Sequence, residues 1–274
     1  MAAPPLRSAP PAGAPTALGG TGPLGGSLRR AAVLTATLGL VHVTLFLLAA
    51  ALVAGVPGPR APDADLIAFY AGAERRRIVL VWLYLMPFSG IAFLWFVVSL
   101  RMWVSDSARR ENVLFSNVQL VSGILFLALF FAGAAASATT ALSVELSASP
   151  VDPVVARQLP LLGSTLLLVF AMRMAAVFVF TTSTIGRTTG VLPRWFAVAG
   201  YPVGAFLLLS ATFSPALVLV FPGWVLVLSV LLLLRARHLP PDPAPPAPPA
   251  PPAPPAPRAP AADTTQTAPP GRGR

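Results

Sequence analysis

Long apolar runs dominate the chain between residues 31 and 234, and short polar stretches separate them. Six of these runs come close to or exceed the roughly 20 residues that an α-helix needs to cross the hydrocarbon core of a bilayer. Because a segment in hydrocarbon must satisfy its own backbone hydrogen bonds, we expect each run to form a transmembrane helix. The six predicted spans are residues 31–54, 78–100, 113–136, 159–182, 193–211 and 215–234.

These runs predict the fold class and the domain organisation. We expect an all-α membrane protein in which residues 29–238 form a six-transmembrane-helix bundle, with disordered tails at residues 1–28 and 239–274. Only residues 212–214 separate the last two runs, so these runs predict an antiparallel hairpin. A single broken segment is the alternative at that position.

The two tails differ from the bundle in composition. Residues 1–28 are rich in Pro, Ala and Gly and bury too little apolar surface to offset their chain entropy. The apolar run after Arg29 and Arg30 is longer than the hydrophobic region of a cleavable signal peptide, so we do not expect this segment to be one. The C-terminal tail carries four consecutive Ala-Pro-Pro units at residues 244–255, which predict an extended polyproline II segment. This proline-rich segment is either a solvated low-complexity tail or a docking strand for a protein partner with an aromatic-lined groove.

Composition narrows the class of protein. Hydrophobic residues make up 55% of the chain and charged residues only 10%, against about a quarter charged in ordinary soluble domains. Together with a mean hydropathy of +0.76, this excludes a water-soluble enzyme. The absence of Cys excludes disulfides, thiolate zinc sites and iron–sulfur clusters. All 19 basic residues are Arg and Pro occurs 32 times, which indicates a GC-rich bacterial genome. Membrane lipids, and not nucleic acids, are the expected partners.

Arginine bias predicts the orientation in the membrane. With the N-terminus inside, nine arginines flank the inner ends of the spans and five lie in the outer loops. The count favours a protein of the cell membrane with both termini in the cytoplasm, whereas the cluster at residues 75–77 is evidence for the opposite orientation. The inner arginines are Arg29, Arg30, Arg101, Arg109, Arg110, Arg187, Arg194, Arg235 and Arg237, and the outer ones are Arg60, Arg75, Arg76, Arg77 and Arg157.

The first outer loop contains a short helical pattern. Asp63 is a candidate N-cap. Leu66, Ile67 and Tyr70 then fall on one side of the predicted helix. An interfacial helix that leads into the second span and a simple extension of that span both fit this pattern.

Ionisable residues deep inside membrane spans are the default candidates for function, because charge is costly in hydrocarbon. The candidates are Arg173 in the fourth predicted span and His42 in the first, and no predicted span contains Asp or Glu. One membrane histidine cannot supply two axial haem ligands. The chain also lacks metalloprotease, serine hydrolase, Walker and dinucleotide motifs. We therefore expect no enzymatic activity, no metal and no cofactor.

The fourth span is apolar enough to carry Arg173. Its Leu, Val and Phe residues contribute roughly −5 kcal/mol of insertion free energy, against about +3 kcal/mol for the arginine. Its helical neighbours are apolar, so polar partners come from other helices or from headgroups by snorkelling. Asn117, Gln119, Tyr201 and His42 are the candidate partners by depth. Arg173 is either a structural arginine or a contact for an anionic ligand, and His42 is either a hydrogen-bonded packing residue or a functional group.

Two further patterns concern helix packing. Gly200 and Gly204 in the fifth span are spaced as a small-residue motif that lets helices approach closely. Pro87, Pro202 and Pro222 lie inside spans and are expected to bend their helices.

Several short motifs resemble a known group of proteins. Residues 65–70 read Asp-Leu-Ile-Ala-Phe-Tyr, residues 93–101 Phe-Leu-Trp-Phe-Val-Val-Ser-Leu-Arg, residues 192–196 Leu-Pro-Arg-Trp-Phe and residues 221–224 Phe-Pro-Gly-Trp. With these motifs, the chain resembles uncharacterised multi-pass membrane proteins of actinobacteria that carry a domain of unknown function. The resemblance covers about residues 31–234. It implies a membrane location and six spans, and it implies no catalytic residues.

Two functions fit these observations. The first is a non-enzymatic integral protein of the plasma membrane that acts as a scaffold or accessory subunit. The alternative is a small permease or lipid-interacting transporter that binds an anionic ligand near Arg173.

Overall fold

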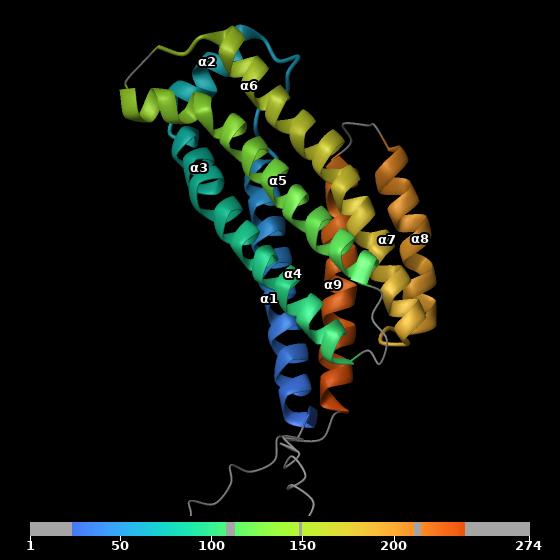
Figure 1. Cartoon of the computed structure of the whole chain (residues 1–274). Coiled ribbons are helices and arrows are strands. Elements are labelled where there is room, and N and C mark those ends of the chain that lie inside the picture. The colour runs from blue at the N-terminus through green and yellow to red at the C-terminus, as the bar shows by residue number, and fades with distance from the viewer. Residues whose placement is uncertain (1–23, 108–112, 148–149, 211–214, 239–274) are drawn as a thin grey trace, which may run out of the picture. The chain divides into compact units, whose positions relative to one another are not determined.

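The computed structural model describes residues 24–107, 113–147, 150–210 and 215–238, and all regular elements within these ranges are helical (Figure 1). The prediction of an all-α fold is therefore confirmed for the described residues. The α-helices are α1 (Leu24–Val53), α2 (Asp63–Ala71), α3 (Glu74–Leu80), α4 (Met86–Ser107), α5 (Val113–Ser147), α6 (Pro153–Thr165), α7 (Met172–Thr189), α8 (Arg194–Leu209) and α9 (Pro215–Arg237). Two π-helical segments, η1 (Val81–Leu85) and η2 (Leu166–Ala171), join α3 to α4 and α6 to α7.

Among the residues that the structure describes, five helical segments are long and apolar enough to cross a membrane. Only 33–44% of the most apolar stretch of each segment is buried inside the protein, so large apolar side chains point outward along the spans. Water does not support a hydrophobic surface of this extent, whereas lipid does. The chain is therefore a membrane-embedded helical protein. The five segments are Arg29–Val53, Glu74–Ser105, Val113–Ser147, Pro153–Thr189 and Leu217–Arg237.

The predicted fifth span corresponds to α8, which is shorter than the others. Its 16 residues rise about 24 Å at roughly 1.5 Å per residue. The hydrocarbon core is about 30 Å thick. Helix length alone therefore supports five spans, and the count of six stays a prediction.

The two tail boundaries differ in how closely they match the prediction. Helix α1 begins at Leu24, so its first five residues fall within the segment 1–28 that was expected to be disordered. Helix α9 ends at Arg237, next to the predicted end of the bundle at residue 238. The rest of the N-terminal tail and the whole predicted C-terminal tail, with its Ala-Pro-Pro units, lie outside the described residues.

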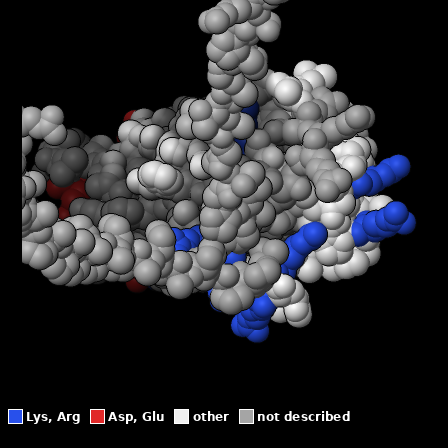
Figure 2. All heavy atoms as spheres, turned by 60° about the horizontal axis from the view of Figure 1, so that its bottom comes forward, with Lys and Arg blue, Asp and Glu red and all other residues white. Residues whose placement is uncertain are grey.

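Neighbouring long helices run antiparallel. Helix α1 packs against α4 and α9, α5 packs against α4 and α7, and α8 packs against α7. Figure 1 shows the beginning of α1 and the end of α9 at the same end of the bundle. We call this the arginine end, because α1, α4, α7, α8 and α9 all place arginines there. Figure 2 shows blue arginine side chains gathered on this end. The described arginines of these helices are Arg29, Arg30, Arg101, Arg173, Arg187, Arg194, Arg235 and Arg237, and all except Arg173 lie near this end.

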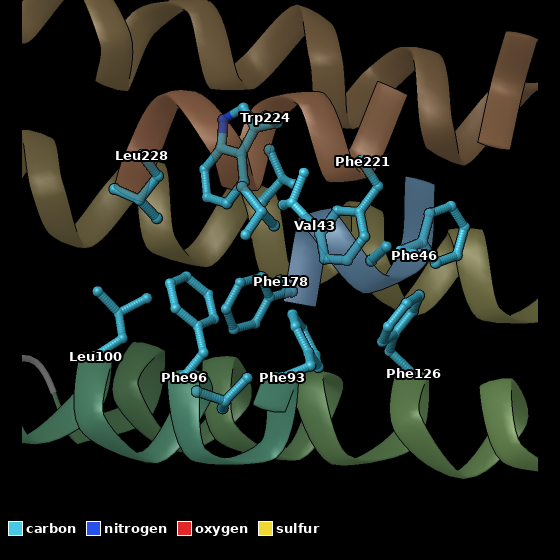
Figure 3. Close-up of a cluster of buried hydrophobic side chains, with 14 of the residues drawn as sticks. Val43, Phe46, Phe93, Phe96, Leu100, Phe126, Phe178, Phe221, Trp224 and Leu228 are labelled. Atoms are coloured by element: carbon cyan, nitrogen blue, oxygen red, sulfur yellow. The ribbon is translucent and has the colours of Figure 1, made fainter. Parts of the chain in front are cut away.

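The centre of the bundle is filled by aromatic side chains (Figure 3). Phe93 of α4 lies 5.0 Å from Phe126 of α5, 5.8 Å from Phe178 of α7 and 5.6 Å from Phe221 of α9, measured between ring centroids. These four rings are at most 1% exposed. Edge-to-face ring contacts add to the packing energy of the buried area. One aromatic cluster therefore links four helices that are far apart in the sequence.

Small residues set the closest helix contacts. A Cβ added to Gly200 would lie 2.9 Å from the Cβ of Ser183 on α7, and one added to Gly204 would lie 3.1 Å from the Phe180 ring. The predicted small-residue packing motif of α8 is thus confirmed as its contact with α7. A Cβ on Gly163 would lie 2.6 Å from the backbone carbonyl of Gly133, so α5 and α6 also meet through glycines.

Local backbone features reflect particular residues. A proline ring blocks the carbonyl four residues earlier, which for Pro87 is Leu83. Leu83 lies within η1, so the π-helical segment absorbs this lost hydrogen bond. Gly190 ends α7 in the left-handed conformation, with φ of 70°, which a residue without a Cβ adopts at little cost. The chain can therefore turn sharply into α8.

Helix α2 is a separate short helix and not an extension of the second span, because an extended glycine follows it. The predicted N-cap role of Asp63 is wrong: Pro62 occupies that position and Asp63 is the first helical residue. Leu66 and Tyr70 of the predicted face are buried, whereas Ile67 is 41% exposed.

We expect Gly163→Ala to lower the melting temperature in detergent by several degrees. The added methyl group would press on a backbone carbonyl of α5, and overpacking costs about 1–3 kcal/mol, with roughly 2–4 °C of melting temperature per kcal/mol. The matched control is Gly223→Ala on α9, whose added Cβ meets no atom within 4 Å. Equal melting temperatures for both variants would contradict the close contact of α5 and α6.

Candidate functional site

Arg173, the strongest sequence candidate, is partly buried on α7. Its guanidinium donates through Nη1 to the carbonyl of Val169, one turn earlier on the same chain and within η2. Among the described residues this is the polar contact that the structure gives it. Arg173 thus bonds within its own helical segment, and the described residues of other helices give it no polar contact.

The predicted partners of Arg173 all lie elsewhere. Gln119 donates through Nε2 to Thr182 Oγ1 over 2.7 Å, and Asn117 accepts from Arg101 over 2.9 Å. Because α5 and α7 run antiparallel, Gln119 is level with Thr182 and lies about nine residues, or roughly 14 Å, from the level of Arg173. The prediction that Asn117 and Gln119 share its depth is therefore wrong.

Tyr201 and His42 are also engaged with other groups. The hydroxyl groups of Tyr201 and Thr184 form a hydrogen bond of 3.1 Å between α8 and α7. His42 is 1% exposed, and its Nδ1 lies 3.0 Å from both Oγ and the carbonyl oxygen of Ser89 on α4. The Ser89 hydroxyl also lies 3.1 Å from the carbonyl oxygen of His42. The histidine ring packs 4.9 Å from the Phe93 ring.

These contacts identify His42 as a packing residue that ties α1 to α4. Its second ring nitrogen, Nε2, is buried and has no partner among the described residues. The five candidate residues are therefore spread over separate helix contacts and form no common site.

Ion pairs gather at the end of the bundle opposite the arginine end. We call it the capped end; it comprises α2, the start of α3, the end of α5 and the start of α6. Arg157 of α6 donates to the carboxylate of Asp63 at 2.7 Å. Arg75 of α3 donates to the carboxylate of Glu145 on α5 at 2.6 Å. These bonds hold α2 and α3 to helices that follow them by 94 and 70 residues.

Two cavities lie next to the capped end. The cap cavity, of about 280 Å³, lies between α2 and helices α1, α5 and α6. The apolar groove, of about 790 Å³, lies between α1, η1, η2 and the first turns of α9. Val53, Trp82, Met86 and Leu167 line both, so the two spaces adjoin. The two π-helical segments contribute to these shared walls, and such segments are frequent at functional sites.

The cap cavity has a polar side. Arg157 is the one charged residue among those that line it. The Arg157 Nη2 also donates to the carbonyl of Ala61 at 2.9 Å, whereas its Nε is buried and has no partner among the described residues. Tyr70 lines the same cavity, and burial raises the pKa of its phenol, so the hydroxyl stays protonated at neutral pH. The cavity therefore offers hydrogen-bond donors next to an apolar space.

Sequence reasoning did not single out the residues of these cavities as a site. In the sequence, Arg157 is only one of five arginines in the outer loops, and Tyr70 only one of three residues on one side of the predicted outer-loop helix. The Pro87 signal pointed to an irregular second span, which is where η1 forms. The cavities themselves arise from contacts between distant segments, which no local pattern reports.

Within the part of the chain that the structure describes, no three His, Cys, Asp or Glu residues come together as metal ligands do. Comparison with protein-family models, with curated proteins and with solved structures finds no match. The resemblance to uncharacterised actinobacterial membrane proteins gains no support from these comparisons and stays a prediction.

We expect Arg173→Leu to leave the melting temperature in detergent unchanged or to raise it, because the arginine bonds only within its helix and its removal saves about 3 kcal/mol of insertion free energy. Gln119→Leu should lower the melting temperature, because it removes a buried bond between α5 and α7, worth about 0.6–1.7 kcal/mol in membranes. A larger loss for Arg173→Leu than for Gln119→Leu would show that Arg173 holds another group across helices.

Proposed function

We propose that the chain is a non-enzymatic integral protein of the bacterial plasma membrane, with six spans, that serves as a scaffold or accessory subunit. The observation that carries this proposal is the filled centre of the bundle. The aromatic cluster around Phe93 fills the space between α4, α5, α7 and α9, which a solute path through the bundle would need. Polar side chains of the spans, such as His42 and Gln119, bond to neighbouring helices.

The permease alternative receives less support from the geometry. A solute carrier needs polar groups that face an accessible space near the middle of the membrane. Arg173 donates to a carbonyl of its own helix, and it lines neither the cap cavity nor the apolar groove. An anion near Arg173 would have to compete with that bond.

The arrangement of α8 supports six crossings. Helix α7 ends toward the arginine end, and α9 begins on the side of the bundle that faces the capped end, although short of α2 (Figure 1). Helix α8 runs antiparallel to α7 between these two ends, so the chain returns across the bundle within it. A local thinning of the bilayer accommodates a span that is a few ångström short. Six crossings place both termini on one side.

The arginine bias supports a cytoplasmic position for that side. Of the arginines that the structure describes, seven lie near the arginine end and five near the capped end. At the capped end, Arg75 and Arg77 are bound to Glu145 and Glu74. The cluster at residues 75–77, which is evidence for the opposite orientation, is thus engaged in contacts within the protein.

Reporter fusions test this topology. A fluorescent protein fused after Arg237 should fluoresce, and alkaline phosphatase inserted at Gly58 or fused after Ser210 should be active, because it folds only outside the cytoplasm. Both reporters are placed at both positions. If phosphatase is inactive after Ser210 but active after Arg237, α8 does not cross the membrane and the six-span proposal is overturned.

Purification in mild detergent tests the scaffold role. We expect the chain to elute with a second polypeptide in constant ratio, with a light-scattering mass above that of one chain. Vesicles that contain the purified chain should show no anion flux above protein-free vesicles. A monomer whose anion flux disappears in Arg173→Leu would favour the permease instead.

A further inference from the structure

We infer that the apolar groove and the cap cavity together form a binding site for one anionic phospholipid, with an acyl chain in the groove and the phosphate at Arg157. This site goes beyond the scaffold role and involves other residues than the polar candidates of the spans. It lies in the half of the membrane next to the capped end.

The groove fits hydrocarbon in size and chemistry. Its volume of about 790 Å³ is within the roughly 300–1,000 Å³ of typical ligand sites. Its wall consists of apolar side chains, among them Phe46, Ala50, Leu168 and Val218. These residues belong to membrane-spanning segments or their ends, so the molecules that surround the groove are lipids.

Lipid hydrocarbon gains little by moving from the bilayer into an equally apolar groove. Selective binding therefore depends on the polar end of the ligand, and the cap cavity supplies it. Arg157 lines this cavity, its Nη2 is held by Asp63 and the carbonyl of Ala61, and its side chain is 33% exposed, so the rest of the guanidinium is accessible to a ligand. Guanidinium groups bind phosphate oxygens with charge-assisted hydrogen bonds. The Tyr70 phenol lines the same space and is a further donor.

The continuity of the two spaces selects a molecule with both parts. Val53, Trp82, Met86 and Leu167 line the groove and the cap cavity alike. A ligand can thus extend from Arg157 into the groove without leaving the protein surface. No carboxylate lines the cap cavity. Asp63, which lies outside the lining, already binds one side of the guanidinium. An anionic headgroup is therefore favoured over a zwitterionic one, whose cation would meet Arg157.

Native mass spectrometry of the full chain tests the site. Protein from vesicles of equal parts phosphatidylglycerol and phosphatidylcholine should retain one phosphatidylglycerol. Ala50→Phe, which fills the groove, should lower retention about threefold to tenfold. The matched control is Ala128→Phe, the same change at an exposed position of α5 that lines neither the groove nor the cap cavity. It should retain the lipid as the unchanged protein does.

Two substitutions at the polar end separate binding from structure. Arg157→Gln should remove the preference for phosphatidylglycerol, whereas Asp63→Asn should strengthen it, because the guanidinium then carries an uncompensated charge. Both changes weaken the same ion pair, so a purely structural clamp would lower retention and melting temperature in both. That result would overturn the proposal.

Three other outcomes would also overturn it. Equal retention of the two lipids in the unchanged protein would indicate only surrounding bilayer lipid. Unaltered retention in Ala50→Phe would place the lipid elsewhere on the protein. A dimer that dissociates in Ala50→Phe would show that a second copy of the chain, and not a lipid, occupies the groove.

Discussion

The structure depends on one constraint: a polar group within hydrocarbon must find its partner inside the protein. Several polar side chains of the spans meet it in pairs, although some buried polar atoms, such as the hydroxyls of Ser183 and Ser229, have no partner among the described residues. His42 bonds with Ser89 between α1 and α4, and Gln119 bonds with Thr182 between α5 and α7. Arg173 obeys it within a single helix. Each such bond leaves one side chain fewer that could bind a solute.

Packing follows from the same environment. In hydrocarbon the hydrophobic effect does not drive helices together, so close packing and edge-to-face ring contacts contribute to holding them. Glycines at positions such as Gly163 and Gly200 allow backbones to approach, and the rings around Phe93 fill the space between four helices. A bundle built in this way is solid at its centre. Its two larger cavities lie next to the capped end, where residues of both π-helical segments line them.

The sequence predicted the membrane class and located five of the long helices, because an apolar run of about 20 residues matches the thickness of the hydrocarbon core. It predicted that Gly200 and Gly204 form a close-packing motif, since small-residue spacing is a local property, but the structure identified α7 as the partner helix. It did not predict the partners of Arg173, because depth in a membrane depends on where each helix begins relative to its neighbours. Helix α5 begins at Val113 as predicted, but α7 continues to Thr189, beyond the predicted end of the fourth span at residue 182, so Arg173 lies farther from the arginine end than a simple count assigns.

The sequence by itself therefore determined that the protein lies in a membrane, that it is helical and where its charges lie along the chain. All three depend on the local order of residues. Only the tertiary structure decided which charges meet. The ion pair of Arg157 with Asp63 joins residues 94 positions apart, and that of Arg75 with Glu145 joins residues 70 apart. Helical periodicity states which face of a helix is apolar, but not which helix that face meets. The cap, the two cavities and the unpartnered Arg157 Nε exist only where those separate segments come together.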